Sequence, residues 1–187
     1  EKIDSEIINP ILPEPLKTNL SDNLLKNPDK IFFTQNEEIQ KAFLLLKTTT
    51  TALGINFNTN SGIEIKFDKI DMEEDAYKII IDSQSVLVLS NNYGGSFYAL
   101  ITLLQLSYFY SGDLPTGTIE DKPKFAWRGM HLDCSRQFHS IKIIKRLLIY
   151  MSLFKLNRFH WHLTDNEAWR LDLKSFPNLA KNSSYRG

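Results

Sequence analysis

Hydrophobic and polar residues alternate with a period of two in several short segments of the first half of the chain. The segment "GIEIKFD" (residues 62–68) alternates apolar with charged side chains, which predicts a half-buried strand. The segments "DKIFFT", "YKIIID" and "VLVLS" predict three further strands. Apolar residues at helical spacing predict helices from about Asn36 to Leu53 and from about Gly94 to Tyr110. This order predicts an α+β domain, a small antiparallel sheet backed by helices.

Proline and glycine mark the limits of this first domain. Three prolines between Ile7 and Leu16 predict extended surface chain. The segment "SGDLPTGTIEDKP" interrupts the helical pattern with two glycines and two prolines, and it predicts a linker. We therefore predict a support domain over residues 1–122 and a second domain over residues 123–187.

The second domain has the pattern of a strand, a helix and a strand. "FAWRGMHLD" and "NRFHWHL" predict strands on either side of "SIKIIKRLLIYMSLFK". In that helix Ser140 is the expected cap, and the apolar face is formed by Ile141, Ile144, Leu148 and Met151. A βαβ unit with short connections predicts parallel strands. Two parallel strands do not make a finished domain, so we expect the first βα units of an incomplete (β/α)8 TIM barrel.

Charge and composition exclude several kinds of partner. The 22 basic and 22 acidic residues cancel, so no net field draws the protein to nucleic acid or to an anionic membrane. The apolar runs are too short for a membrane span. Cys134 is the single cysteine, which rules out an internal disulfide, and we expect it to be a small buried apolar residue.

Polar side chains gather at the end of each predicted strand of the second domain. Alternation puts Arg158, His160 and His162 on one face, with Asp165 just beyond the strand end. The histidine pair is open to three interpretations: zinc ligands, hydrogen-bonded residues inside the barrel, or one wall of a pocket. Zinc needs at least one more ligand. The remaining histidines, His131 and His139, have no obvious chelating spacing, so a metal is the least favoured of the three.

The loop after the first of these strands carries Asp133 and Arg136. A guanidinium has five donors in a fixed fork, so Arg136 is suited to grip hydroxyls or carboxylates at the rim of a barrel. The alternative is that Arg136 only forms a structural bridge with Asp133 or Asp165. Arg128, just before Gly129, is expected to be structural.

Longer stretches add a family resemblance. "IEDKPKFAWRGMHLDCSRQFHS" and "KLNRFHWHLTDNEAWRLDLKSFPNL" resemble glycoside hydrolase family 20, the β-N-acetylhexosaminidases, and "NPILPEPLK" and "NNYGGSFYALITLLQL" resemble the small domain before the family's barrel. The resemblance implies a retaining exo-hydrolase that removes terminal N-acetylglucosamine or N-acetylgalactosamine with no metal or other cofactor. In this family the substrate's own 2-acetamido oxygen is the nucleophile. An adjacent Asp-Glu pair orients that group and supplies the general acid.

The resemblance also assigns roles by position. Arg136 matches the arginine that binds hydroxyls of the terminal sugar. Asp165 matches the carboxylate that orients the acid through a histidine from a later strand. The resemblance gives Asp133, His160 and His162 supporting positions around them. The family commonly has a second Asp and then Gln-Gly where this chain has Asn166–Ala168, so loop contacts there are expected to differ.

The same comparison predicts that these 187 residues alone are inactive, because the family's Asp-Glu pair belongs to a later part of the barrel. The remainder of the barrel is then a partner, as more of the same protein or as a separate polypeptide. An exported or lysosomal-type location is typical of the family. Two other functions stay open: a non-catalytic carbohydrate-binding or scaffolding protein of the same fold, and a metal-dependent barrel hydrolase that uses His160 and His162.

Overall fold

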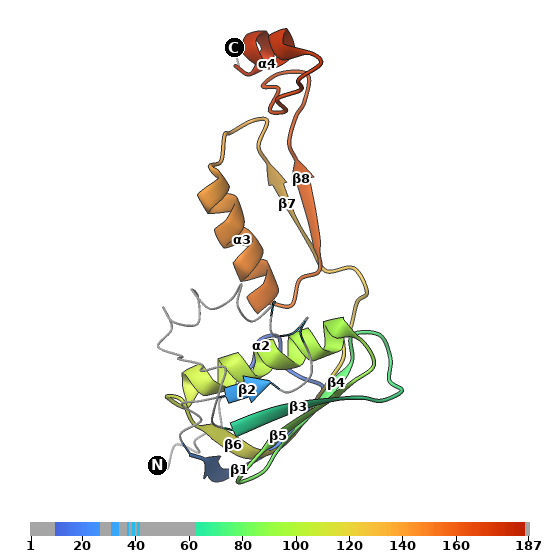
Figure 1. Ribbon diagram of the computed structural model, residues 1–187, viewed down its shortest axis with the longest axis vertical. Helices are drawn as coiled ribbons and strands as arrows, with labels where there is room; N and C mark the ends of the chain where they lie inside the picture. Colours follow the sequence, from blue (N-terminus) through green and yellow to red (C-terminus); the bar gives the residue numbers. More distant parts are fainter. Residues whose placement is uncertain are drawn as a thin grey trace, which may run out of the picture. The chain divides into compact units, whose positions relative to one another are not determined.

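The chain divides into two compact units, residues 1–124 and 125–187. A computed structural model describes residues 10–26, 31–33, 37, 39, 41 and 63–185. The first unit contains a six-stranded sheet and the helix α2 (Tyr93–Phe109), and the second contains a βαβ unit followed by a short helix (Figure 1). The fold class is therefore the predicted one, a mixed α/β domain followed by parallel βα units.

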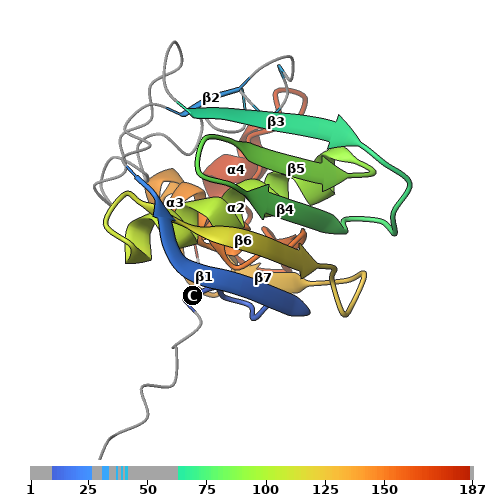
Figure 2. The ribbon, with the colours of Figure 1, turned by 90° about the horizontal axis from the view of Figure 1, so that it is seen from below.

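The sheet of the first unit is mixed. Its strands are β1 (Lys17–Leu25), β2 (Ile31–Phe33), β3 (Ile63–Lys69), β4 (Tyr77–Ile81), β5 (Val86–Ser90) and β6 (Leu114–Asp121). They lie in the order β1-β6-β4-β5-β3-β2 (Figure 2). Pairing is antiparallel from β1 to β5 along this order, but β5 with β3 and β3 with β2 are parallel. This corrects the prediction of an antiparallel sheet: β4 and β5 form a hairpin whose second strand, β5, lies beside β3.

The core of the first unit lies between the sheet and α2. Strands β4 and β5 alternate buried and half-buried side chains, as their sequence pattern predicts. The buried row includes Ile79 and Val88, both without exposed surface. Helix α2 packs on β4, β5 and β6 and buries Leu100, Ile101 and Leu104. Burial of this apolar surface is the main stabilising term of the unit.

Helix α2 begins and ends within one residue of its prediction. The Asn92 side chain accepts a hydrogen bond from the Gly95 backbone N–H at 2.9 Å, which caps the first turn. A Cβ at Gly95 would overlap the Ala76 carbonyl, so the start of α2 packs closely on the chain before β4. Tyr108 continues the apolar spacing of the helix, but it is 58% exposed because it belongs to the last turn.

Strand β6 replaces the predicted linker. Gly117 has φ +139, and a Cβ there would overlap the Asn19 carbonyl of β1. Pro115 pairs with Leu24 of β1 and precedes the part of β6 that pairs with β4, so its missing N–H is not needed by β4. Both residues disfavour a strand locally, but Gly117 pairs with both β1 and β4 and Pro115 pairs with β1, and this pairing outweighs the local preference. Strand β1 itself was not predicted.

The predicted helix from Asn36 to Leu53 falls largely outside the described residues. Within it the structure describes Glu37, Ile39 and Lys41 as helical, and Ile39 is fully buried.

The second unit is the predicted βαβ arrangement. It consists of β7 (Gly129–Asp133), α3 (Ile141–Leu153) and β8 (Arg158–His162), and α4 (Pro177–Ser183) follows. Strands β7 and β8 are parallel. Ser140 lies at the start of α3 as predicted, but its side chain makes no capping hydrogen bond.

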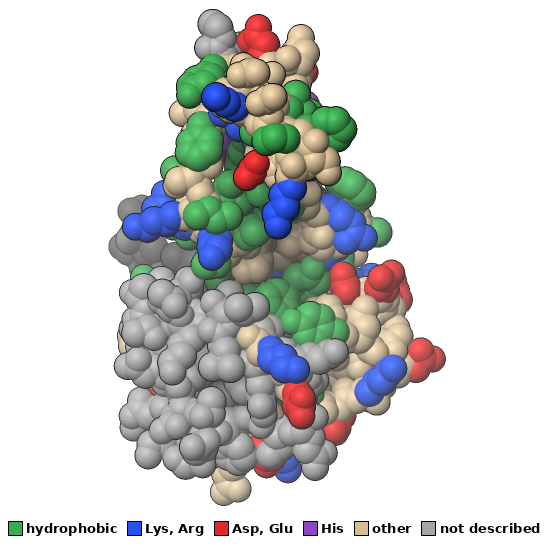
Figure 3. Space-filling model, turned by 45° about the horizontal axis from the view of Figure 1, so that its top comes forward, with side chains coloured by type: hydrophobic (Ala, Val, Ile, Leu, Met, Phe, Trp, Pro, Cys, Tyr) green, Lys and Arg blue, Asp and Glu red, His purple; other side chains and the backbone are tan. Residues whose placement is uncertain are grey.

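Much apolar surface of the second unit is exposed. On α3, Ile144 and Met151 are buried, whereas Ile141 and Leu148 are exposed. Figure 3 shows hydrophobic side chains exposed between Lys and Arg side chains on one face of the molecule. A two-stranded parallel sheet normally has both faces covered, and these exposed positions agree with an unfinished barrel. None of the helices in the described ranges combines the length and apolar character that crossing a bilayer requires.

Arg128 holds the entry to β7 in place. Its Nε donates to the Lys155 carbonyl and its NH1 donates to the Phe125 carbonyl, both at 2.8 Å. The structural role predicted for Arg128 is confirmed.

Candidate functional site

The register of β7 and β8 gathers polar side chains on one face at one end of the two strands. His131 lies opposite His160, and Asp133 lies opposite His162. Because side chains alternate along a strand, these four residues share a face. The two strands run side by side in the same direction, so the loops that follow them emerge together (Figure 1). This is the end of a parallel sheet at which barrel enzymes place their chemistry.

Asp133 organises the loop after β7. Its Oδ1 accepts hydrogen bonds from the backbone N–H groups of Ser135 at 2.9 Å and Arg136 at 3.0 Å. Its Oδ2 lies 2.7 Å from NH1 of the Arg136 guanidinium. The hydrogen bond from the Arg136 N–H is the main cause that lowers the pKa of the Asp133 carboxyl. The hydrogen bond from the Ser135 N–H and the charges of Arg136 and His162 lower it further. The predicted bridge between Arg136 and Asp133 is therefore formed. Asp133 holds both the backbone N–H and the guanidinium of Arg136.

Asp165 lies in the loop after β8 and pairs with the last residue of that strand. Its Oδ2 lies 3.2 Å from His162 Nε2, and its Oδ1 accepts the Asn166 backbone N–H at 2.8 Å. The Asn166 N–H first and the His162 hydrogen bond second lower the pKa of the Asp165 carboxyl, and the charge of Arg136 lowers it further. The polar cluster at the strand ends thus consists of two pairs, Arg136 with Asp133 and Asp165 with His162, and the charge of Arg136 acts on both carboxylates.

Contacts between the two loops support this cluster. The Ser135 hydroxyl donates to the Glu167 carbonyl at 3.0 Å, and Arg170 Nε donates to the Cys134 carbonyl at 3.1 Å. Cys134 itself is buried, as predicted, and its sulfur lies 3.1 Å from Trp161 Nε1. Sequence reasoning missed Ser135 and Arg170, because nothing in their local pattern shows that the two loops meet.

His131 is the residue that most changes the sequence interpretation. The sequence offered no chelating spacing for it, but the register of β7 and β8 sets its ring 4.6 Å from that of His160, centroid to centroid. One nitrogen from each of His131, His160 and His162 lies within 4.8 Å of the others. Spacing along the chain hides such a group, whereas aligning "MHLD" with "FHWH" as parallel neighbours would have found it. His139 lies outside this group.

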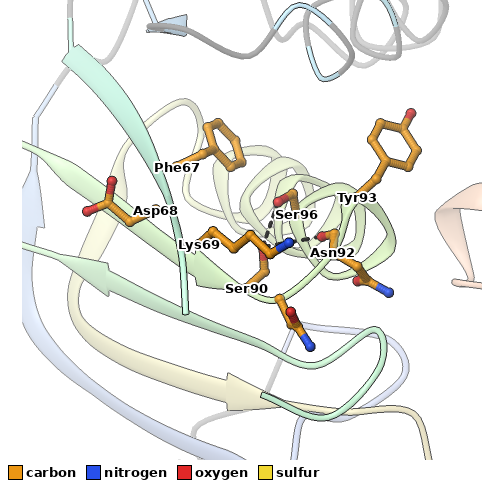
Figure 4. A pocket seen from close by; sticks show the side chains of 8 residues that line it. Phe67, Asp68, Lys69, Ser90, Asn92, Tyr93 and Ser96 are labelled. Carbon is orange, nitrogen blue, oxygen red and sulfur yellow. Dashed lines mark hydrogen bonds between the residues drawn. The ribbon is translucent and has the colours of Figure 1, made fainter. Parts of the chain in front are cut away.

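The first unit has a pocket of about 220 Å³ near the start of α2. Figure 4 shows Lys69 extending across it toward Asn92, with Ser90 and Ser96 behind. The Ser90 and Ser96 hydroxyls lie 2.6 Å apart, and the Ser90 hydroxyl also donates to the Asn92 carbonyl at 3.3 Å. The polar wall of this pocket thus includes Asn92, which caps α2, and Ser90, which is hydrogen-bonded to it.

Two family models match the chain along most of its length. The model of glycosyl hydrolase family 20, domain 2, matches residues 9–122, and the model of the glycosyl hydrolase family 20 catalytic domain matches residues 125–187. The parallel βαβ unit, with an arginine and carboxylates at its strand ends, lies within the part that the catalytic-domain model matches. With both matches in order, the chain belongs to glycosyl hydrolase family 20.

Individual relatives agree with this. A β-hexosaminidase from Porphyromonas gingivalis is 31% identical over 94% of the chain, which covers 25% of that protein. The structure of an inactive mutant of a GH20 exo-β-N-acetylglucosaminidase from Vibrio harveyi aligns with a TM-score of 0.82 and 34% identity, over 96% of this chain and 29% of that one. The Vibrio harveyi enzyme in complex with N-acetylglucosamine aligns with a TM-score of 0.77 and 34% identity, over 94% and 28%. The chain therefore spans less than a third of each of these proteins.

Proposed function

We propose that this chain forms the support domain and the first part of the sugar site of a β-N-acetylhexosaminidase. The substrate is a terminal N-acetylglucosamine or N-acetylgalactosamine of an oligosaccharide or glycoconjugate. The observation that carries the proposal is that Arg136 and Asp165 lie in the loops that directly follow two neighbouring parallel strands. Membership of family 20 and the N-acetylglucosamine complex of the Vibrio harveyi relative support it.

Arg136 is proposed to bind hydroxyls of the terminal sugar. Its side chain is 68% exposed, so a ligand can reach it, and the contact of its NH1 with Asp133 orients the guanidinium. The planar fork suits neighbouring hydroxyl oxygens better than a lysine ammonium does.

Asp165 is proposed to orient the general acid through a histidine from a later strand. A general acid needs a pKa raised toward the working pH. The surroundings of Asp133 and Asp165 lower their pKa values, so both suit hydrogen-bond acceptance by a carboxylate and neither suits the acid role. The acid is therefore expected from the rest of the protein, as the family resemblance implies.

The proposed reaction retains configuration and uses the substrate's own acetamido group. The acetamido oxygen forms a bond to the anomeric carbon while the acid Glu protonates the departing glycosidic oxygen. The same Glu then takes a proton from water, which attacks the anomeric carbon and restores the acetamido group. An adjacent Asp orients the acetamido group, and no metal takes part.

The test uses the native-length protein that contains this chain and a chromogenic N-acetylglucosaminide. We expect hydrolysis that a chelator leaves unchanged. Arg136→Ala should lower kcat/KM by about 10- to 150-fold, since hydrogen bonds to a charged group contribute about 1.5–3 kcal/mol. Arg146→Ala, on the exposed face of α3, is the matched control and should keep wild-type kcat/KM.

Loss of activity with a chelator, or equal kcat/KM for the wild type and Arg136→Ala, contradicts the proposal. Tight binding of N-acetylglucosamine without hydrolysis would instead support the non-catalytic carbohydrate-binding alternative.

A further inference from the structure

Three of the four histidines of the chain converge on one face of the β7–β8 ladder. His131 and His160 are direct neighbours across the two strands, and His162 lies two residues beyond His160 on the same face. Strand register fixes this grouping, so it does not depend on a loop conformation. We propose that His131, His160 and His162 bind a divalent first-row transition-metal ion such as Zn²⁺ or Co²⁺.

The separation of the three rings suits such an ion. One nitrogen from each ring lies within 4.8 Å of the other two. Zn²⁺ binds imidazole nitrogen at about 2.0–2.1 Å in a tetrahedron, which sets pairs of nitrogens roughly 3.3 Å apart. Small rotations of the three side chains, which move the ring nitrogens by roughly 1 Å, would bring them to this spacing. Three imidazoles leave a fourth coordination position for water.

A carboxylate supports the group from outside. Asp165 Oδ2 lies 3.2 Å from Nε2 of His162, which is the carboxylate–histidine pairing that fixes the ring of a metal-bound histidine. Nδ1 of His162 is then the nitrogen for the ion. A carboxylate in this position also offsets part of the charge of a dication.

Charged neighbours of the group among the described residues include Asp133 and Arg136 at the loop end of the strands and Arg158, two residues before His160 on the same strand. Asp133 lies opposite His162 in the strand register and two residues beyond His131. The Arg136 guanidinium, which would repel a cation, is held by Asp133 at 2.7 Å. The carboxylates of Asp133 and Asp165 thus both lie at the strand ends beside His162, where they attract a cation.

This site goes beyond the proposed sugar hydrolysis, in which no metal takes part. Its test therefore measures the metal itself. The native-length protein is stripped of metal with a chelator and titrated with Co²⁺, whose absorption bands report tetrahedral nitrogen ligation, and with Zn²⁺ by calorimetry. We expect one ion per chain.

His131→Gln is the decisive variant, because it removes one ligand and leaves the His162–Asp165 contact in place. Its affinity should fall by more than about 100-fold, since loss of an outer partner alone costs about 10- to 100-fold. Asp165→Asn should lower affinity within that smaller range. His139→Gln is the matched control, because His139 is the one histidine outside the group, and it should bind like the wild type.

Thermal melting of each stripped variant shows whether it folds, and His160→Gln serves if His131→Gln does not. The proposal is overturned if the stripped wild type takes up no stoichiometric Co²⁺ or Zn²⁺. It is equally overturned if folded ligand variants bind as the wild type does, or if His139→Gln loses as much affinity as they do. Each of these results leaves the proposed hydrolase function standing.

Discussion

At the scale of single residues, the loop after β8 carries a backbone conformation that its side chain does not favour. Ala168 is fully buried and has φ +56. A residue with a Cβ pays roughly 1–2 kcal/mol in the left-handed region, whereas glycine does not. The family resemblance places a glycine at this position, so the departure noted in the sequence has a physical cost here.

Ala168→Gly is therefore expected to stabilise the second unit by about 0.5–1 kcal/mol, after subtracting the greater freedom that glycine has in the unfolded chain. All three tryptophans lie in this unit, so urea unfolding followed by tryptophan fluorescence measures its free energy of unfolding. The matched control is Ala180→Gly in α4, which should lose about 1 kcal/mol of stability. Equal destabilisation by both changes would show that Ala168 is not strained.

A buried tyrosine gives the first unit a defined pH dependence. The Tyr77 hydroxyl lies 2.6 Å from the Thr102 hydroxyl and donates to Asp121 Oδ2 at 2.9 Å. Burial first, and the Asp121 charge second, raise the pKa of Tyr77 well above the ordinary value of 10.0. The folded state then holds this proton more tightly than the unfolded chain does.

A raised pKa gives stability that is complete below pH 10.0 and is lost as the pH rises from there toward the folded value. Above pH 10.0 the wild type should lose up to about 1.4 kcal/mol per pH unit more than Tyr77→Phe. At neutral pH Tyr77→Phe should cost about 1–3 kcal/mol, because it removes a partner of buried Thr102. Urea unfolding by circular dichroism at several pH values measures both effects, and parallel curves above pH 10.0 would contradict the assignment to Tyr77.

At the scale of elements, β6 depends on one glycine. Gly117 combines φ +139 with a close approach to the Asn19 carbonyl of β1. Gly112 also has a positive φ, +102, but a Cβ there would meet nothing within 4 Å. The two glycines therefore separate backbone strain from steric overlap.

Gly112→Ala should cost about 1–2 kcal/mol from strain alone. Gly117→Ala should cost more than about 3 kcal/mol, because β1 must also move away from β6. Circular dichroism during urea unfolding measures the difference. Similar losses in the two variants would mean that β1 does not press on β6 at this point.

The elements that sequence predicted well are those whose signals are local. Helices α2 and α3 and strands β4, β5, β7 and β8 have clear apolar periods, and their ends follow residues such as Asn92. Strand β6 was misjudged as a linker because Pro115 and Gly117 are breakers on any local scale. Only pairing with β1 and β4, distant in sequence, explains why they lie in a strand.

In the candidate site, too, some features follow from local sequence signals and others depend on long-range pairing. Arg136 and Asp165 follow predicted strands, and the parallel pairing of those strands places their loops at the same end of the ladder. The group formed with His131 required the register between β7 and β8, which no local pattern specifies. Links between the loops, such as Arg170 to the Cys134 carbonyl, required the loop conformations themselves.

At the scale of the whole molecule, the two units differ in how completely they bury their apolar surface. The first has a core between its sheet and α2, whereas the second exposes large side chains such as Trp127 and Phe138. The three relatives described above are more than three times as long as this chain, with 25–29% of their length covered. We infer that further strands of the barrel cover this surface in the native-length protein.

The most direct test of the account is the structure of the native-length protein with N-acetylglucosamine bound. We predict the sugar at the ends of β7 and β8, with a hydroxyl within about 2.7–3.2 Å of the Arg136 guanidinium and Asp165 within hydrogen-bonding distance of a histidine from a later strand. A sugar bound elsewhere on the protein, with Arg136 and Asp165 still paired only within their own loops, would contradict it.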